Sequence, residues 1–380
     1  MRNTTRALAA ALAAVLAGSP LAAQGTLSTQ GLGYPVGGTS VRASGTAGSF
    51  GEFDLLSPIN PASLGALTRT VITAQTEPEY RTVKVGGSSN GSTAQRVPLV
   101  MVAIPLRSGV GLGLSATTFL DRSYSTTTRG EVVIDSVTLF TSDVTDVRAS
   151  IADIRFAAAW QRSNRFSLGF GLHLFTGDDQ ATRLRTFTDS TRFGGAIDSS
   201  KMVYFGTALS TGAEWRIKKG LAAQISYRIG FGMKTRLADS VFSEANVPNR
   251  LGLGVRFDGI PGSIFAIGVD HQDWTRMQSL GSSLVTARDA TNWHIGGETE
   301  GPMLRGLPML VRAGFARNAL PFGVEGKWVS ESRYSTGLGV PVAREQASID
   351  LSVQWANRSL AGGGAKETAW LIGVGVQIRP

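Results

Sequence analysis

Cysteine is absent from the chain, which excludes disulfide bonds and thiolate metal sites. Histidine is scarce, and His173, His271 and His294 are too far apart in the sequence to form a local metal-binding motif. Neither a P-loop nor an H-E-x-x-H motif is present. Residues Asp270 to Asp273 are the one cluster of acid/base side chains. They do not share a face of the strand, because neighbouring residues such as Asp270 and His271 point to opposite faces. We therefore expect no enzyme, no cofactor and no metal.

Long apolar runs are missing beyond the first residues of the chain. Arg2 and Arg6 precede an apolar run from Ala7 to Ala17, which small residues follow up to Ala23. This order predicts a secretory signal peptide over residues 1–23, with Gln24 as the other possible cleavage point. No later stretch is apolar enough for a membrane helix of ~20 residues. An exported chain of this kind that enters a membrane must do so as a β-barrel.

The chain is rich instead in alternating segments, of which residues 221–234 are the clearest. Odd positions from Leu221 to Met233 are all apolar, whereas even positions from Ala222 to Lys234 are small, polar or charged. Alternate side chains of a strand leave opposite faces, so one face is apolar and the other polar. The segment is also long, since a tilted strand of ~9–11 residues already crosses a bilayer.

Fourteen long strands are expected along the chain. They lie at residues 68–85, 95–106, 109–124, 150–161, 165–176, 200–216, 220–236, 249–257, 263–276, 292–299, 308–317, 332–342, 347–357 and 367–379. Short joints such as 162–164 and 217–219 alternate with long ones such as 125–149 and 177–199. Outer-membrane barrels have short periplasmic turns and long outer loops in this alternation.

The expected fold is therefore all-β: a transmembrane antiparallel β-barrel of about 14 strands over residues 68–380. A soluble β-sandwich or propeller would explain the alternation, but not the strand lengths, the signal peptide and the two classes of joint together. Tryptophans near the strand ends predict two interfacial girdles. Trp160 and Trp215 adjoin short turns, and Trp274, Trp293, Trp355 and Trp370 lie near long loops.

Residues 24–67, between the signal peptide and the first strand, differ from the rest of the chain. Glycine and proline are frequent there, which argues against regular strands, although residues 52–56 could begin a short helix. The segment is long enough to fold into the lumen and plug it, and we call it the hatch. It contains Asn60-Pro61-Ala62, followed by Leu64, just before the first strand.

This arrangement resembles the FadL/TodX family of outer-membrane transport proteins for hydrophobic compounds, along the whole mature length. The resemblance rests on the glycine- and alanine-rich start, on Asn60, Pro61 and Ala62 at the family's hatch motif, and on the fourteen strands. Two features depart from the family pattern: Glu52 and Asp54 are not adjacent, and the last strand ends without an aromatic residue. The resemblance implies a plugged fourteen-stranded barrel and uptake by diffusion without energy coupling.

Charged residues of both signs share the inward parity of the expected strands: Asp153, Arg155, Glu214, Arg228, Arg256, Asp270, Glu298, Arg312 and Asp350. One interpretation is a salt-bridge network that holds the hatch to the wall. The other is that an arginine binds a substrate carboxylate, for which Arg228 and Arg256 are the candidates because they lie on neighbouring strands. For His173 and His294, which share this parity, we expect hydrogen-bonding roles.

The functional hypothesis is an outer-membrane channel for passive uptake of hydrophobic small molecules, such as long-chain fatty acids. The alternative is a non-transporting barrel that anchors or scaffolds secretion or surface partner proteins. The expected location is the outer membrane of a diderm bacterium. The expected partners are membrane lipids, whose anionic head groups suit the formal charge of +9, a hydrophobic substrate, and the barrel-assembly machinery during biogenesis. No nucleic-acid partner is expected.

Overall fold

The computed structural model describes residues 27–106, 109–134, 137–188, 193–237, 240–280, 285–304, 306–324, 326–342 and 346–380. The signal peptide expected over residues 1–23 lies outside these residues. Among the described residues, no helix has both the length and the apolarity needed to cross a bilayer.

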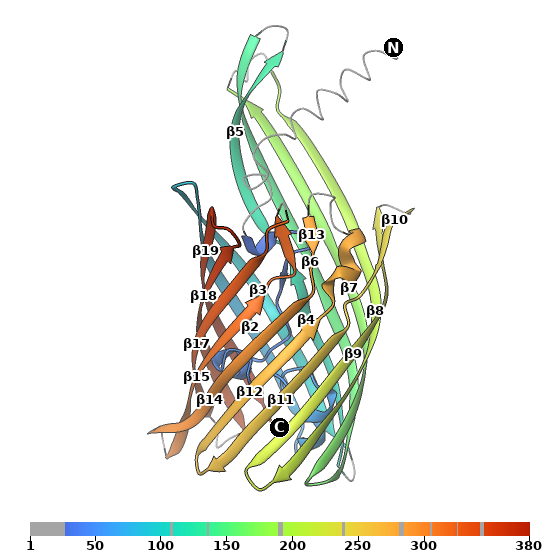
Figure 1. Cartoon of the computed structure of the whole chain (residues 1–380), viewed down its shortest axis with the longest axis vertical. Coiled ribbons are helices and arrows are strands. Elements are labelled where there is room, and N and C mark those ends of the chain that lie inside the picture. The colour runs from blue at the N-terminus through green and yellow to red at the C-terminus, as the bar shows by residue number, and fades with distance from the viewer. Residues whose placement is uncertain are drawn as a thin grey trace.

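Fourteen antiparallel strands form one closed barrel (Figure 1). The barrel closes where the last strand pairs with the first, from Ala365 opposite Val85 to Ile378 opposite Ile72. The strands are β2 (Val71–Val85), β3 (Ser88–Pro105), β4 (Val110–Asp121), β6 (Val137–Ser163), β7 (Phe166–Phe187), β8 (Ala196–Lys218), β9 (Leu221–Leu237), β11 (Arg250–Ile260), β12 (Ser263–Gln272), β14 (Ala290–Leu304), β15 (Leu307–Ala319), β17 (Val329–Val342), β18 (Ala347–Leu360) and β19 (Ala365–Ile378). Each corresponds to one of the fourteen expected strands, so the predicted fold class is confirmed.

The expected long loops contain more structure than the sequence suggested. Additional elements are β5 (Tyr124–Ile134), β10 (Ser240–Asn246), η4 (Trp274–Leu280), β13 (Val285–Ala287) and β16 (Phe322–Val324). The loops predicted at 125–149 and 177–199 are wrong: β5 pairs with β6, and β6 to β8 continue past the barrel wall as a projecting sheet (Figure 1). β-Branched residues such as Thr126–Thr128 favour strand there. The strand expected over 263–276 ends at Gln272, where η4 follows.

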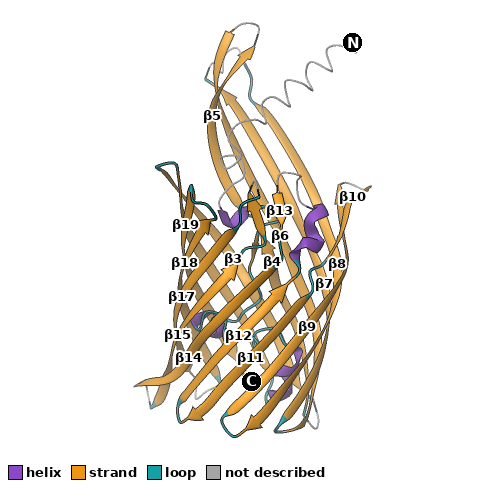
Figure 2. Ribbon diagram, in the orientation of Figure 1, coloured by secondary structure: helices purple, strands orange, loops and turns teal. Residues whose placement is uncertain are grey.

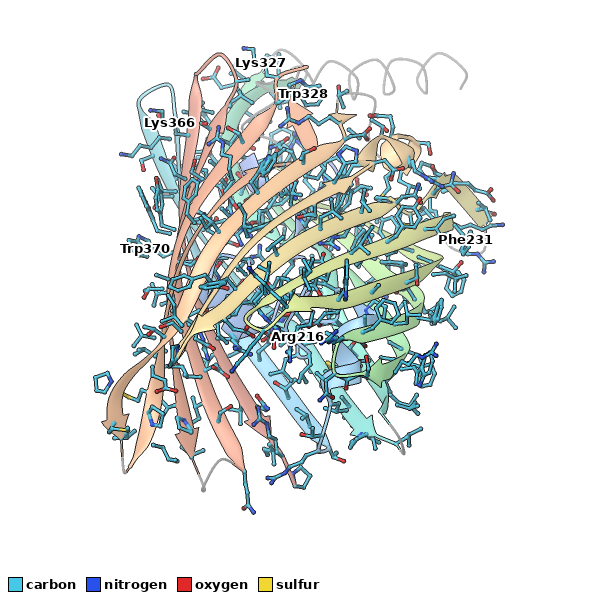
Figure 3. All side chains as sticks on the ribbon, turned by 60° about the horizontal axis from the view of Figure 1, so that its bottom comes forward. Arg216, Phe231, Lys327, Trp328, Lys366 and Trp370 are labelled. Atoms are coloured by element: carbon cyan, nitrogen blue, oxygen red, sulfur yellow. The ribbon has the colours of Figure 1, made fainter. Side chains whose placement is uncertain are left out.

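The alternation of β9 places its apolar side chains outside the barrel. Ile225 is 46% and Phe231 42% exposed, whereas Gln224 and Ser226 are buried in the lumen. Figure 3 shows Phe231 and Trp370 pointing away from the wall. Met233, expected on the same outer stripe, is instead fully buried. The pairing of β8 with β9 shifts between Gly206 and Ala208, and this bulge turns the rest of β9 over.

Five of the six tryptophans that were predicted to form two girdles lie on the outer face of the barrel. Trp160, Trp215, Trp293 and Trp370 are exposed on the outer surface, and Trp355 is partly buried beside Trp370. Trp274 is wrong as a girdle residue, because it lies in η4 and is 1% exposed. It stacks on Phe119 with ring centroids 5.3 Å apart, in a lumenal core that includes Met233. A position near a strand end therefore does not distinguish a tryptophan on the outer surface from one in the lumenal core.

The described part of the hatch lies inside the barrel (Figure 2). Its elements are η2 (Leu27–Thr29), β1 (Tyr34–Pro35), α3 (Val41–Gly45) and η3 (Pro61–Ala66). α3 packs against β15 and β17 to β19, and η3 against β4 and β6 to β8. The helix expected to begin at residues 52–56 is wrong, since these residues form turns. The short helices begin instead at Ser40 and Asn60, whose side chains cap backbone N–H groups.

Candidate functional site in the barrel lumen

The Asn60-Pro61-Ala62 motif fixes the end of the hatch to two strands of the wall, β7 and β9. Asn60 Oδ1 accepts a hydrogen bond from the Ala62 N–H at 2.9 Å, and its Nδ2 donates to Gln224 Oε1 of β9 at 2.9 Å. Ser167 Oγ of β7 donates to the Ala62 carbonyl at 2.7 Å. Pro61 occupies the first position of η3, where its missing N–H costs nothing. The motif therefore caps a short helix and joins it to the wall.

Two glycines make this close approach possible. Gly169 of β7 and Gly212 of β8 are paired across the sheet beneath the motif. A Cβ atom at Gly212 would lie 1.9 Å from Asn60 Oδ1, and one at Gly169 would lie 2.3 Å from the Pro61 carbonyl carbon. Any side chain at either position would collide with the hatch.

Ion pairs hold the middle of the hatch to strands β11 and β14. Arg42 of α3 makes a bidentate pair with Glu298 of β14, at 2.6 and 3.0 Å. Burial by itself would lower the pKa of Arg42, but Glu298 and Asp54 raise it above its usual value. Glu52 accepts from Arg250 Nη2 of β11 at 2.6 Å. These contacts correspond to the salt-bridge interpretation of the lumenal charges.

His294 of β14 also contacts the hatch. Its Nδ1 lies 2.9 Å from the Ala47 carbonyl oxygen, and its Nε2 lies 3.0 Å from Asp270 Oδ2. Asp270 accepts further hydrogen bonds from Gln272 and Asn292, which fits a carboxylate. Both ring nitrogens of His294 therefore face acceptors, one in the hatch and one on the neighbouring strand β12.

A cavity of about 160 Å³ remains between the hatch and the wall. Its hatch side includes Gly37, Gly38 and Gly48 together with larger residues such as Tyr34 and Ile59. Its wall side combines aromatic and polar groups, and includes Phe119, Asp153, His173, Ser210, Arg228 and Trp274. The lumen is therefore neither a continuous apolar pocket nor filled edge to edge by charged side chains.

Arg228, one of the two predicted substrate-contacting residues, lines this cavity. Its guanidinium lies over the rings of Phe119 and Phe175, at 5.2 and 5.6 Å from their centroids. Its closest carboxylate is Asp153, with Nη1 and Oδ2 4.0 Å apart. Within the described part of the chain, Arg228 Nε has no hydrogen-bond partner. The Arg228 guanidinium is thus held by aromatic faces, and it keeps an N–H donor that no described residue accepts from.

Arg256, the other candidate, is not among the residues that line the cavity. It lies near the short turn after β11, where Nη2 is 3.6 Å from Glu214 and 3.5 Å from Asp258. Its guanidinium covers the ring of Phe53 in the hatch, 5.1 Å from the centroid. The structure therefore separates the two arginines that the sequence grouped together, because they lie at different heights on their strands.

Three residues of neighbouring strands form a hydrogen-bonded chain along the cavity. Both carboxylate oxygens of Asp153 (β6) lie 2.9 Å from Nδ1 of His173 (β7). Nε2 of His173 lies 2.8 Å from Oγ of Ser210 (β8). All three are buried, at 8%, 3% and 7% exposure. The sequence placed Asp153 and His173 on the inner face but gave Ser210 no role.

A larger group of charges, the outer charge cluster, surrounds Tyr34 of the hatch. Its members are Tyr34, Glu79, Arg81, Arg96, Asp121, Glu331, Arg333, Arg358 and Glu367. The Arg358 guanidinium lies 4.5 Å from the Tyr34 ring centroid, and the Tyr34 hydroxyl donates to Glu331 at 3.0 Å. Burial raises the pKa of Tyr34 to about 12.

Arg358 lies at the centre of this cluster. It bonds Glu331 and Glu79 at 2.7 Å each and also pairs with Glu367, so it joins β18 to β17, β2 and β19. The sequence analysis missed the cluster. The signal was present as alternation, since Glu77, Glu79 and Arg81 share one face of the first strand. That face is the lumenal one.

No protein-family model and no curated protein matches the sequence. Solved structures do match the fold. A FadL homologue from Pseudomonas aeruginosa superimposes with a TM-score of 0.61 at 12% identity, covering 90% of this chain and 98% of that one. The toluene transporter TodX of P. putida gives 0.59 at 11%, covering 91% and 99%. The monoaromatic hydrocarbon channel CymD gives 0.57 at 12%, covering 91% and 98%.

These likenesses extend over nearly the whole length of each protein, and at this identity they concern the fold. The resemblance to the FadL/TodX type that the sequence predicts is thus confirmed at that level: the chain is a fourteen-stranded β-barrel of the FadL/TodX fold.

Proposed function

We propose that the protein is an outer-membrane channel for passive passage of hydrophobic small molecules. The observation that carries this proposal is the cavity beside Arg228, where aromatic rings from β4, β7 and η4 meet inside a barrel that the hatch fills. An apolar molecule could leave water there by contacting Phe119 and Trp274, whereas the outer surface offers only lipid contact. The monoaromatic hydrocarbon channel CymD and the toluene transporter TodX, which share the fold, support the proposal.

The proposed route runs along the hatch. Residues 24–67 act as a plug whose lower end is fixed by Asn60, Pro61 and Ala62, so passage requires the hatch to shift above that point. The cavity wall offers Arg228 as the cation for an acidic substrate, and long-chain fatty acids remain the substrate class that we propose. Arg256 is paired near the short turn after β11, towards the same lower end of the hatch, and its proposed contribution is limited to that end.

Uptake of a labelled long-chain fatty acid by cells that carry the full chain tests the proposal. Cells carrying Arg228→Gln should take up the label several-fold more slowly, because the cavity loses its cation. Arg148→Gln removes a guanidinium that is 78% exposed in the projecting sheet, and should leave uptake unchanged. A labelled monoaromatic hydrocarbon should be insensitive to both substitutions if it uses the same cavity.

A version that lacks residues 24–64 separates transport from a passive scaffold. Without the plug, small hydrophilic solutes should pass the barrel, and purified protein should conduct ions in a planar bilayer. Equal uptake of the hydrophobic label with and without the full-length protein would reject the channel. If the version without residues 24–64 conducts no ions and passes no hydrophilic solutes, the hatch does not act as a plug.

The projecting sheet supports the second candidate, a barrel that anchors partner proteins. β5 pairs with β6 along its length, and exposed apolar side chains such as Val133, Phe140 and Ile197 line the projection. Replacing residues 126–145 by a short turn should leave the barrel folded, since β4 pairs directly with β6 from Ser150 to Trp160. If uptake persists while surface capture of a partner is lost, the two roles are separate.

A further inference from the structure

The hydrogen-bonded chain of Asp153, His173 and Ser210 has the connectivity of a nucleophile, a base and an orienting carboxylate. Asp153 accepts from Nδ1–H of His173, which leaves Nε2 as the ring acceptor for the Ser210 hydroxyl proton. Both heavy-atom distances are within the range that proton transfer requires. The three residues come from β6, β7 and β8, whose paired backbones fix them rigidly.

The same place offers cations for a developing negative charge. Arg228 is the cross-strand partner of Ser210. On the other side, a Cβ built at Gly171 would lie 2.5 Å from Ser210 Oγ and 3.4 Å from Arg155 Cδ, so the Arg155 side chain passes the same glycine, although Arg155 is not among the residues that line the cavity. Arg155 Nε and Nη1, like Arg228 Nε, have no hydrogen-bond partner among the described residues, and Arg155 is only 2% exposed. Unpaired buried donors are costly unless something uses them.

The Ser210 side chain also lines a cavity that a substrate could enter. Asp153, His173, Ser210 and Arg228 all line the cavity beside the hatch, with Phe119 and Trp274. Ser226 lines the same cavity one strand further on, but its hydroxyl accepts from Arg250 Nη1 at 3.1 Å and no histidine faces it. Four serines line the cavity, Ser44, Ser49, Ser210 and Ser226, and among the described contacts Ser210 is the one that is hydrogen-bonded to a histidine.

We propose that Asp153, His173 and Ser210 form a serine-hydrolase site in the barrel lumen that cleaves small carboxylic esters. Ser210 and His173 are its catalytic residues, and Asp153 is a positioning residue that holds the ring. The guanidinium group of Arg228, which lines the same cavity, stabilises the oxyanion. This inference is independent of the proposed transport function and revises the hydrogen-bonding role expected for His173.

The reaction has two steps. Ser210 Oγ bonds to the ester carbonyl carbon and its proton passes to His173 Nε2; the bond to the alkoxy group then breaks, and His173 protonates the leaving alcohol. Water next attacks the acyl-serine carbonyl and gives its proton to His173. The bond to Oγ breaks, Ser210 recovers a proton, and the carboxylic acid leaves. Ester and water are consumed, and acid and alcohol are formed.

Active-site labelling of the purified full-length protein in detergent tests the site directly. A fluorophosphonate probe should modify Ser210 and leave Ser226 unmodified. Trypsin places the two in separate peptides, residues 202–216 and 220–228, and each peptide contains one serine. Mass spectrometry can therefore assign the label without any substitution. No label on the 202–216 peptide of folded protein would overturn the proposal.

Hydrolysis of p-nitrophenyl acetate provides the kinetic test. Ser210→Ala should lower the rate at least tenfold, towards the rate of detergent alone, whereas Ser226→Ala should stay within about twofold of the unchanged protein. Asp153→Asn should lower the rate and alter its pH profile, because the ring loses the acceptor that orients it. An equal rate for the unchanged protein and a folded Ser210→Ala variant would contradict the mechanism. If that variant does not fold, the labelling result decides.

Discussion

Single side chains determine how firmly the hatch is held. Asn60 makes two hydrogen bonds: its side-chain oxygen accepts from the Ala62 N–H, and its side-chain nitrogen donates to Gln224. It is fully buried, so loss of the side chain leaves Gln224 Oε1 without this donor in a place that water does not reach. One residue thus couples a helix cap to the barrel wall.

Asn60→Ala should weaken the lower end of the hatch by about 1–3 kcal/mol, the cost of a lost cap together with an unpaired buried group. Hydrogen exchange of residues 60–66 should become faster, while exchange in the barrel strands should not change. Asn90→Ala, which alters an exposed residue of the β2–β3 hairpin, is the matched control. Unchanged protection of residues 60–66 would show that packing alone holds η3.

His294 holds the middle of the hatch through both ring nitrogens, which contact the Ala47 carbonyl and Asp270. His294→Ala removes both contacts and should speed hydrogen exchange around residues 46–49. His271→Ala, which alters an exposed histidine of the neighbouring strand β12, is the matched control. Equal exchange around residues 46–49 in the two variants would show that packing alone holds this part of the hatch.

The sequence predicts which of these residues face the lumen, but it does not predict the contacts between them. Parity alone placed Asp153, Arg228 and Asp270 on the inner face, because the pleat of a strand allows only two directions. It could not place Ser210 against His173, since that contact depends on the register between β7 and β8. Because a long joint connects β7 and β8, their hydrogen-bonded register is not fixed by the connection, and a single sequence does not reveal it.

At the scale of elements, long strands were predictable and their local irregularities were not. Apolar alternation locates β9, but the bulge that turns Met233 inward leaves no trace, because methionine suits lipid and core equally. The tryptophan of η4 was misplaced for a similar reason: an indole ring fits an interface and a buried aromatic cluster. The projecting parts of β5 to β8 resemble loops in the sequence, because polar residues interrupt their alternation.

The contact between η3 and the wall predicts a second effect of substitution. Gly212→Val would drive a side chain into Asn60, so η3 should leave its place and the hatch should be cut faster by protease at residues 56–67. Gly232→Val is the control, because a Cβ at Gly232 meets nothing within 4 Å. Both substitutions lie in barrel strands and should leave the strand content by circular dichroism unchanged. Equal proteolysis of the two variants would contradict the close approach.

At the scale of the whole molecule, the barrel depends on joining its first strand to its last. Backbone pairing between β2 and β19 closes the cylinder, and the outer charge cluster adds side-chain bonds across the same junction. Arg358 is fully buried and bonds Glu79 on β2 and Glu367 on β19. Charges at this depth are tolerable only as a complete set, because each unpaired member carries the full penalty of burial.

Arg358→Met should therefore destabilise the entire barrel rather than one strand. The substitution preserves much of the side-chain volume but leaves Glu79, Glu331 and Glu367 facing one another without the central cation, at a cost of about 3–5 kcal/mol. The temperature at which the compact form seen in detergent gels converts to the unfolded form should fall by about 10 °C.

Two further variants distinguish charge from packing. Arg317→Met removes an exposed guanidinium from β15 and should leave the conversion temperature unchanged. Adding Glu367→Gln to Arg358→Met removes one of the opposed carboxylates, so part of the lost stability should return. If the double variant is less stable than Arg358→Met, the cost comes from lost contacts at the junction and not from uncompensated charge. Recovery would instead show that a balanced set of buried charges closes the barrel.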